Sequence, residues 1–345
     1  MCHVVVIGAG ITGVTTAYEL SQLVYQVTVV DRHLFPAMET SFANGGQLSA
    51  CNAEVWNQKS TVLKGMKWMS QKSAPLLLNP AFSVHKYAWL MEFLGNIKHY
   101  EANTHETVRL ALLARQRLFE IADKESIDFN LEKRGILHFY HNKQDYDVAI
   151  RVNDLLNKGG LERSGVSNEE IKQIEPTLTG EYYAGFYCEG DATGDIHKYT
   201  TGLAEVTKKL GVKYRFGMDV TDIQHLTSGV EVKLQPSSEN VELLPNEVEM
   251  LAADAVVVCA GVGSYQLAEL VQERVNVYPV KGYSITVMLN DEESQQNAPW
   301  VSLLDESAKI VTSRLGKDRF RVAGTAEFNG YNRDIRADRI QPLVD

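Results

Sequence analysis

The sequence predicts an α/β protein in which a parallel, nucleotide-binding domain is interrupted by a largely antiparallel (α+β) domain. Three observations lead to this prediction. A glycine-rich turn joins a short apolar run to a helical pattern at the start of the chain. A second apolar run ends in glycine at Gly261. After Val277, strand patterns follow one another without helices between them, which is typical of antiparallel sheet.

The first 31 residues follow the order strand, glycine turn, helix, strand, acid. His3 to Ile7 is an apolar run typical of a buried parallel strand, and Gln26 to Val30 is a second one, followed by Asp31. Between them, Gly8-Ala9-Gly10-Ile11-Thr12-Gly13 opens a helical pattern that reaches Leu23. A G-x-G-x-x-G alone is weak evidence, but this context is the fingerprint of a dinucleotide-binding unit. A plain glycine-rich turn is the alternative.

Each part of this fingerprint has a physical role. Gly8 lets the chain turn sharply, Gly10 lets a pyrophosphate approach the backbone, and Gly13 allows the helix to pack closely on the strands. The helix N-terminus offers free N–H groups and a positive dipole end to phosphates. Asp31, roughly 20 residues after the glycines, can accept hydrogen bonds from ribose hydroxyls. The glycine that often ends such a helix is missing from Leu23-Val24-Tyr25-Gln26, so that turn needs another solution.

The composition limits which classes of protein and which binding partners fit this chain. A chain of 345 residues suits about two domains. The net charge of −10 and the lack of a basic patch argue against a nucleic-acid partner. Four scattered cysteines without C-x-x-C spacing predict neither a metal site nor a disulfide framework, and they fit a reducing compartment. No apolar run reaches the ~20 residues that span a bilayer, and the first strand begins at His3, so we expect a cytoplasmic protein without a signal peptide.

Two stretches point to contacts with a ligand or a surface. The first, Glu39 to Ser49, is rich in small and polar residues, including adjacent glycines, and its place after Asp31 predicts cofactor contact; a plain loop is the alternative. The second stretch is rich in aromatic residues and fits either a peripheral contact with the inner membrane or a buried inter-domain helix. Its large apolar residues are Leu76, Leu77, Leu78, Phe82, Tyr87, Trp89, Leu90, Met91 and Phe93.

The middle of the chain alternates helices and strands, and the last part is mostly strands. We expect helices at 85–119, 143–158, from 167 to just before Pro176, from 195 to 210 and after Tyr265. We expect strands at 135–140, 185–188, 212–216, 220–223, 230–234 and, as one buried strand, 252–261. The last strands are predicted at 277–287, 300–303, 309–312 and 320–323. His85, His138 and His197 show no spacing typical of a triad or metal site, so we interpret them as structural.

Several segments together resemble the family of D-amino acid dehydrogenase small subunits, which lies within the D-amino-acid-oxidase-like FAD-dependent oxidoreductases. The resemblance covers nearly the whole chain. Thr40-Ser41-Phe42-Ala43-Asn44 and Pro279-Val280-Lys281-Gly282-Tyr283-Ser284 are specific at subfamily level, whereas the N-terminal fingerprint is shared more widely. The other segments that carry it are 190–195, 256–261 and Arg321-Val322-Ala323-Gly324-Thr325-Ala326-Glu327.

The resemblance implies a Rossmann-like FAD-binding domain with an inserted antiparallel-sheet substrate domain. The expected boundaries are 1–85, 191–271 and 325–345 for the FAD-binding domain, and 86–190 and 272–324 for the substrate domain. It also implies oxidative deamination of an amino acid, expected to be a D-amino acid, to the 2-oxo acid and ammonia. Hydride would pass from Cα to flavin N5, and electrons would go on to a quinone of the respiratory chain or another acceptor.

The same resemblance implies which residues contact FAD. Gly8, Gly10, Ile11, Thr12 and Gly13 would hold the pyrophosphate, and Asp31 and Arg32 would lie at the adenosine ribose. Ser41, Asn44, Gly45, Gly46 and Gln47 would approach the flavin, Val220 would meet the adenine, and Ala260 and Gly261 would pass beside the pyrophosphate. No residue is assigned to acid–base catalysis. Candidates for contact with the substrate are Tyr283 and Arg314 at its carboxylate, and Lys281 near the flavin.

One departure keeps alternatives open. Members of this family continue beyond the equivalent of Glu327 with a Gly-x-Arg-Pro turn, whose arginine often binds the substrate carboxylate, and with a Gly-His-Gly segment; neither motif occurs before Asp345. The leading hypothesis is an FAD-dependent amino acid dehydrogenase. Two alternatives are an oxygen-using oxidase of the same fold and a non-catalytic FAD-binding protein. A nicotinamide-dependent dehydrogenase is a weaker fourth hypothesis.

Overall fold

The computed structural model describes residues 2–58, 74–238 and 247–344. The chain divides into two compact units. Unit 1 is Met1–Ala43, Glu125–Phe129 and Ile196–Tyr278, and unit 2 is Asn44–Lys124, Asn130–Asp195 and Pro279–Asp345. The predicted domain boundaries assigned 44–85 and 325–345 to FAD binding, although both stretches belong to unit 2 by compactness. Because those boundaries concern which segments bind the cofactor, they stay a prediction.

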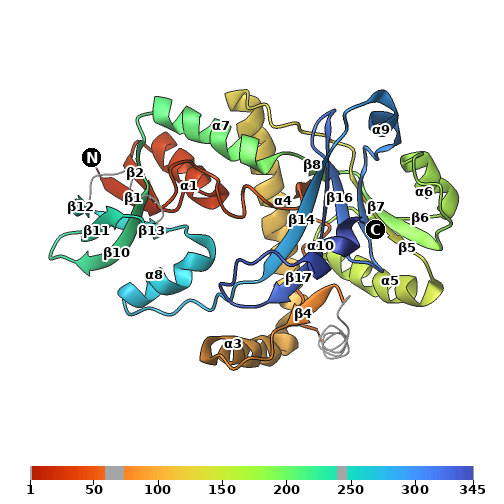
Figure 1. The fold of residues 1–345 in the computed structure, drawn as a ribbon, viewed down its shortest axis with the longest axis horizontal. Helices are drawn as coiled ribbons and strands as arrows, with labels where there is room; N and C mark the ends of the chain where they lie inside the picture. The colour runs from red at the N-terminus through yellow and green to blue at the C-terminus, as the bar shows by residue number, and fades with distance from the viewer. Residues whose placement is uncertain (1, 59–73, 239–246, 345) are drawn as a thin grey trace. The chain divides into compact units, whose positions relative to one another are not determined.

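Unit 1 contains the parallel sheet that the fingerprint predicts. Its strand order is β13-β1-β2-β9, and all neighbours run parallel. Helices α1 and α7 lie side by side (Figure 1). The bounds are β1 (His3–Ile7), α1 (Ile11–Gln22), β2 (Gln26–Asp31), α7 (Ile196–Lys209), β9 (Lys213–Phe216) and β13 (Ala255–Val258). The Rossmann-like prediction is confirmed.

A three-stranded antiparallel sheet packs against this parallel sheet. It has the order β10-β11-β12, from β10 (Met218–His225), β11 (Val230–Pro236) and β12 (Glu249–Ala253). Val232 and Leu234 of β11 share one buried apolar cluster with Val5, Ile7 and Val30 of the parallel sheet. The strands predicted at 220–223 and 230–234 are therefore confirmed, and burial of these side chains holds them on the nucleotide-binding fold. The short η2 (Gly261–Gly263) and α8 (Ser264–Leu270) follow β13.

The prediction of one buried strand over 252–261 was wrong. The chain leaves β12 at Ala253 and enters β13 at Ala255, which belongs to the other sheet. Asp254 stands between them, and its Oδ2 accepts a hydrogen bond from the backbone N of His3 at 2.6 Å. Val258 of β13 is 38% exposed, because β13 ends the strand order of the four-stranded sheet. An apolar run cannot show that a single aspartate divides it between two sheets.

The turn after α1 is made without glycine. Val24 has φ of +64°, the left-handed conformation that ends helices and that glycine usually supplies. The backbone N of Tyr25 then donates to the carbonyl of Leu20 at 3.2 Å. Such a conformation costs a residue with a branched Cβ about 1–2 kcal/mol, and this cost is the physical consequence of the missing glycine.

Unit 2 is built on one large sheet with the order β14-β17-β16-β15-β5-β7-β6, and β4 pairs with β17. Most neighbours are antiparallel, as predicted, but β15 pairs with β5 and β17 with β4 in parallel. The bounds are β4 (Leu76–Leu78), β5 (Ile136–Tyr140), β6 (Ser164–Val166), β7 (Ala184–Cys188), β14 (Lys281–Met288), β15 (Ser302–Asp305), β16 (Ile310–Arg314) and β17 (Arg319–Phe328).

The remaining elements of unit 2 are helices and one two-stranded ladder. One helix, α9, lies between β14 and β15, so the prediction of strands without helices between them was wrong. Ser167 and Glu170 form a capping box at the start of α6, as expected for that predicted helix start. The bounds are α3 (Val84–Gly95), η1 (Asn96–His99), α4 (Tyr100–Glu125), α5 (Lys143–Lys158), α6 (Asn168–Ile174), α9 (Glu292–Asn297) and α10 (Ala337–Val344), with β3 (Gln47–Leu48) paired to β8 (Ala192–Thr193). Within the described ranges, no helix combines the length and apolarity that a bilayer crossing requires.

Candidate functional site

The glycine turn of unit 1 has the geometry that a phosphate cradle needs. Gly8 has φ of +109°, and a Cβ there would lie 2.4 Å from the carbonyl oxygen of Cys259. A Cβ on Gly13 would lie 1.8 Å from the carbonyl oxygen of Gly8, so α1 can approach β1 this closely only with glycine. Gly10 is the N-cap of α1. Gly8 and Gly13 therefore fulfil the steric roles that the fingerprint gives them, and the approach of a pyrophosphate at Gly10 stays a prediction.

The N-terminus of α1 is suited to an anion. Its N-cap has no side-chain hydrogen bond, and no acidic residue lies in its first turn. Ser41 Oγ accepts from the backbone N of Ile11 at 2.9 Å, which brings the predicted contact residue Ser41 to this helix end. Thr12 is exposed. Backbone N–H groups and the helix dipole together favour a phosphate at such a position.

Asp31 lies at the end of β2, beside the same turn. Its Oδ2 accepts from the backbone N of Ala9 at 2.6 Å, and its Oδ1 accepts from the backbone N of His33 at 2.8 Å. Each carboxylate oxygen keeps a further lone pair, and the residue is partly exposed, so both oxygens can still accept from ribose hydroxyls. Arg32 forms an exposed ion pair with Glu39 at 2.8 Å.

Three further predicted contacts belong to unit 1. Ala260 follows β13, and its Cα would be 3.1 Å from a Cβ on Gly8. Gly261 has φ of +54° and begins η2. Val220 lies in β10 at an irregularity of the β10–β11 pairing and packs on the cluster that includes Val30. The turns after β1 and β13 thus meet at one end of the parallel sheet, where open α/β sheets bind their ligands.

These residues fit the nucleotide half of FAD, because the N-terminus of α1 has no side-chain cap and no acidic residue in its first turn, and the acid lies where a ribose is expected. Unit 1 also has a depression of about 840 Å³ between loop 34–42 and α7. Phe35, Phe42, His197 and Phe216 contribute to its lining, and none of the predicted nucleotide contacts does.

In unit 2, residues 44–51, here called segment 44–51, cross one face of the large sheet. Arg321 of β17 donates to the carbonyl oxygen of Asn44 at 3.3 Å. Ser313 of β16 donates to the carbonyl oxygen of Gly45 at 2.6 Å. Gln47 donates through Nε2 to Ser302 Oγ of β15 at 2.7 Å. Three neighbouring strands therefore hold successive residues of the segment that the sequence predicts beside the flavin.

The two adjacent glycines have a steric reason. Gly46 has φ of +71°, and a Cβ there would be 3.1 Å from Leu315 Cδ2 and 3.2 Å from Ser313 Cβ. A Cβ on Gly45 would be 3.3 Å from Val311 Cγ2. The backbone of the segment therefore lies directly on β16 and the residue after it. The Oδ1 of Asn44 accepts from the backbone N of Gly46 at 2.9 Å and stabilises the turn.

The far end of segment 44–51 meets a buried polar group that the sequence did not reveal. Asp191, fully buried, accepts from the backbone N of Ala50 at 2.9 Å and of Cys51 at 3.0 Å. Cys51 Sγ lies 3.0 Å from His138 Nε2, and His138 Nδ1 lies 2.9 Å from Glu306 Oε1. The only sequence signal was the loop 190–195, one of the segments that carried the resemblance.

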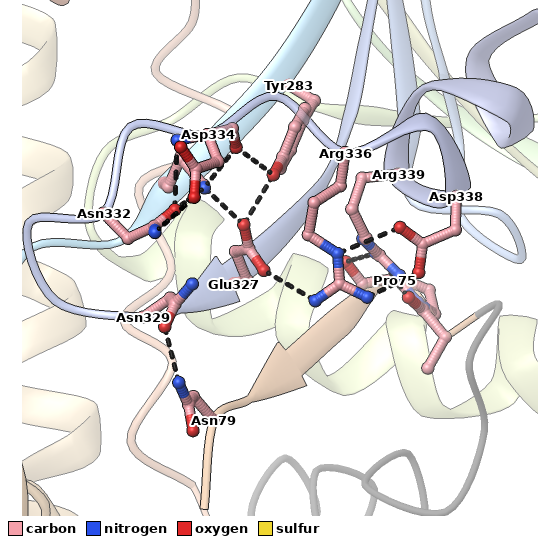
Figure 2. Close-up of polar contacts among 12 residues, drawn as sticks. Pro75, Asn79, Tyr283, Glu327, Asn329, Asn332, Asp334, Arg336, Asp338 and Arg339 are labelled. Atoms are coloured by element: carbon pink, nitrogen blue, oxygen red, sulfur yellow. Dashed lines mark hydrogen bonds and ion pairs between the residues drawn. The ribbon is translucent and has the colours of Figure 1, made fainter. Parts of the chain in front are cut away.

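Tyr283 and Lys281, two of the substrate candidates, both contact Glu327. Figure 2 shows Tyr283 directed at Glu327. The Tyr283 hydroxyl donates to Glu327 Oε1 at 2.5 Å, and Lys281 Nζ lies 2.6 Å from the same oxygen. Figure 2 shows Arg336 directed at the other oxygen, at 3.5 Å. Despite the cost of burial, hydrogen bonds from Lys281 and Tyr283 hold the pKa of Glu327 below its ordinary value. The carboxylate thus ties β14 and β17 to the 329–338 loop.

Arg314, the third candidate, is 1% exposed and donates to backbone carbonyls. The acceptors are the carbonyl oxygens of Gly316 at 3.0 Å, Ala298 at 2.8 Å, Gln295 at 3.1 Å and Lys317 at 2.8 Å. Its guanidinium also lies over the ring of Trp300, 4.1 Å from the centroid. This arrangement supports a structural role and does not favour the predicted contact with a substrate carboxylate.

Arg321 is a candidate that the sequence reasoning passed over, although it begins the motif Arg321-Val322-Ala323-Gly324. It is partly buried on the face that carries segment 44–51, with Nε donating to Thr286 Oγ1 at 3.1 Å. Burial lowers its pKa. No carboxylate of the described residues lies within ion-pair distance of it, so this cation can accept an anionic ligand. Arg314 also has no carboxylate partner among the described residues, but its guanidinium is engaged by four backbone carbonyls, whereas Arg321 donates to one carbonyl and one hydroxyl.

Comparison with known proteins gives a consistent result. A model of the family "FAD dependent oxidoreductase" matches residues 3–345. The chain is 55% identical over 345 residues to D-amino acid dehydrogenase 3 of Mesorhizobium japonicum, covering all of this chain and 82% of the relative. It is 38% identical over 348 residues to a D-amino acid dehydrogenase of Dechloromonas aromatica, covering 99% of this chain and 81% of the relative.

Solved structures share the fold at low identity. Glycine oxidase from Geobacillus kaustophilus has a TM-score of 0.70 at 17% identity, covering all of this chain and 77% of that one. L-Proline dehydrogenase from P. horikoshii has a TM-score of 0.66 at 15% identity, covering 99% of this chain and 75% of that one. With a glycine cradle and an acid at the end of β2 in unit 1, and a family match over almost its full length, the chain belongs to the FAD dependent oxidoreductases.

Proposed function

We propose that this protein oxidises a D-amino acid to the 2-oxo acid and ammonia, with FAD as its cofactor. The observation that carries the proposal is the phosphate cradle of unit 1, with Asp31 beside it, in a chain 55% identical to a D-amino acid dehydrogenase. Bound FAD would accept the substrate's Cα hydrogen as hydride at N5. The resulting imine is hydrolysed by water, so the protein needs no dedicated acid–base pair for that step.

The residues proposed to contact FAD fall into two groups along the chain. Gly8, Gly10 and Gly13 shape the pyrophosphate cradle, with Ile11 and Thr12 in the first turn of α1, and Asp31 accepts from the ribose. Segment 44–51 continues the chain from Ser41 and supplies Asn44 to Gln47 on the flavin side. Orientation of Cα is the main contribution left to the protein, because alignment of reacting atoms lowers the barrier by several kcal/mol, on the order of 7–11.

Arg321 is our choice for the group that binds the substrate carboxylate. Its guanidinium lies on the face that holds Asn44 and Gly45 and has no carboxylate partner among the described residues, whereas the guanidinium of Arg314 is engaged by four backbone carbonyls. Replacing Arg321 by Gln removes a charge-assisted hydrogen bond worth roughly 1.5–3 kcal/mol. We expect KM to rise about 10- to 100-fold with a smaller change in kcat. Unchanged KM in Arg321→Gln would reject the assignment.

The test of the reaction is a spectrum followed by a substrate screen. The purified protein, or the protein reconstituted with FAD, should show flavin absorbance. An artificial electron-accepting dye should then be reduced by a subset of D-amino acids and not by their L-enantiomers. A protein that binds FAD but oxidises no amino acid of either hand would fit the non-catalytic alternative and contradict the proposal. Turnover with L-amino acids alone would correct the handedness only.

The electron acceptor is proposed to be a quinone of the respiratory chain. The two named sequence relatives are dehydrogenases, while one structural neighbour is an oxidase. The discriminating measurement compares turnover with a soluble quinone analogue and with oxygen at equal substrate concentration. Quinone-linked turnover at least 10-fold above peroxide formation supports the dehydrogenase. The opposite ratio identifies an oxygen-using oxidase.

We also propose a peripheral contact between α3 and the inner membrane. Phe82, Val84 and Met91 are 82%, 71% and 70% exposed, while Trp89 packs on Phe328 of β17 and holds the helix on unit 2. An exposed apolar row of this kind suits the interface of a lipid surface. The holoprotein should sediment with phosphatidylglycerol vesicles, and Met91→Glu should weaken this while the matched exposed change Ile335→Glu does not. No sedimentation with any vesicle would refute the contact.

A further inference from the structure

Segment 44–51 is fixed at its far end by a buried carboxylate. Asp191 has no exposed surface, and its two oxygens accept separately from the backbone N of Ala50 and the backbone N of Cys51. Arg115 Nη1 lies 2.5 Å from Asp191 Oδ1 and balances the charge. Removing a partner of such a buried ionic group costs more than a surface contact would. Two successive backbone N–H groups on one carboxylate leave the chain little freedom at this point.

The Cys51 side chain is fixed by a second chain of contacts. Its sulfur lies 3.0 Å from His138 Nε2, and His138 Nδ1 lies 2.9 Å from Glu306, which is also paired with Lys309. Burial lowers the pKa of His138 to about 4, so the imidazole is neutral near pH 7. Because Glu306 is ionised and can only accept, Nδ1 carries the proton and Nε2 accepts from the Cys51 thiol. The Cys51 thiol thus donates to His138, and His138 donates to Glu306.

In segment 44–51, Gln47 follows Gly45 and Gly46, which pack against β16, and precedes Ala50 and Cys51, which Asp191 and His138 hold. Its Nε2 donates to Ser302 Oγ, and its Oε1 accepts from Asn52 Nδ2 at 2.9 Å. Asn52 follows Cys51 directly, so the position of the Gln47 amide depends on where Cys51 is held. Displacement of Cys51 would therefore be transmitted to Gln47 through Asn52 as well as through the backbone.

We propose that Asp191 and His138 are positioning residues for the reaction, because they fix the far end of segment 44–51 and so hold Asn44 to Gln47 in register on the sheet. This inference rests on the proposed function, which assigns those four residues to the flavin side. A displacement of about 1 Å in groups that align substrate and cofactor can lower a rate about 10²-fold. The role is indirect: neither residue is assigned a contact with substrate.

The experiment compares Asp191→Asn with Glu175→Gln in the holoenzyme. Glu175 is a matched control, since it is also a buried carboxylate of unit 2 that accepts from two successive backbone N–H groups, those of Trp300 and Val301, at 2.8 and 2.9 Å. Both variants should lower the thermal midpoint. Only Asp191→Asn should change the visible flavin spectrum and lower the rate of flavin reduction at saturating D-amino acid, by about 10-fold or more.

A second pair keeps the test valid if Asp191→Asn fails to fold. Cys51→Ala removes the donor to His138, whereas Cys51→Ser keeps an O–H that can make the same hydrogen bond. Cys51→Ala should slow flavin reduction, and Cys51→Ser should restore a rate several-fold above it. Equal spectra and rates in the Asp191 and Glu175 variants, or no rescue by serine, would overturn the proposal. A wild-type protein that binds no FAD or oxidises no amino acid would instead refute the proposed function.

Discussion

The guanidinium of Arg314 donates to four backbone carbonyls, and this use determines what its replacement should do. Arg314→Met leaves these buried acceptors without their partner. A lost buried, charged donor costs roughly 1.5–3 kcal/mol or more, so urea unfolding should show a loss of at least about 2 kcal/mol. The substrate KM should stay near that of the wild type. A selective rise in KM with normal stability would show that Arg314 binds the carboxylate after all.

His138 makes stability depend on pH in a defined window. Burial lowers its pKa from 6.5 to about 4, so the unfolded chain takes up a proton that the folded chain refuses. Stability from this group is complete above pH 6.5 and is lost as the pH falls from 6.5 towards 4, by up to about 1.4 kcal/mol per pH unit. His138→Gln should flatten this part of the profile in urea unfolding. An equally steep loss in the variant would contradict the assignment.

The roles of some single residues could be predicted from the sequence, and the roles of others could not. The cradle glycines and Asp31 could be predicted because their spacing directly encodes a turn and a strand end. Arg314 and Arg321 could not be ranked, since both are arginines in strand patterns of the same sheet. Only the three-dimensional contacts show that one guanidinium is used by carbonyls and the other has no carboxylate partner among the described residues.

Segment 44–51 is the element on which the flavin side of the proposal depends. Gly46 has a positive φ and no room for a Cβ beside Leu315 and Ser313, whereas Gly282 of β14 has nothing within 4 Å of its Cβ position. Gly46→Ala should therefore weaken FAD retention and cost about 1–3 kcal/mol of stability. The control Gly282→Ala should cost less than 1 kcal/mol. Thermal unfolding and flavin release on dilution measure both, and equal effects would refute the packing argument.

At the level of elements, the sequence predicted strand identity better than strand partners. Apolar runs and alternation located the four strands of the parallel sheet and most strands of the large sheet, because each strand has its own periodicity, but β4 and β6 were missed. The division of 252–261 at Asp254 and the parallel pairing of β15 with β5 depend on contacts between distant segments, which periodicity does not encode. The aromatic stretch gave the same difficulty. A helix was expected where α3 lies, but the sequence could not show which of its apolar side chains are exposed and which are buried.

For the whole molecule, the composition and the N-terminal fingerprint were sufficient to predict two units, and the structure has two. The site in unit 2 was less predictable, because the residues proposed to bind or to position groups there come from segments as far apart as Asn44, His138 and Arg321. Loop 190–195 illustrates the reason. Its position in the sequence gives no sign that Asp191 fixes Cys51, 140 residues away.

The most direct test of the central claim is anaerobic mixing of the FAD-loaded protein with a D-amino acid. If the cradle of unit 1 binds FAD and the amine is oxidised at Cα, the visible flavin absorbance is lost without oxygen or dye. The loss should be slower with substrate deuterated at Cα and should fail with the L-enantiomer. Flavin absorbance that persists with every D-amino acid, or a protein that cannot be loaded with FAD, would contradict the account.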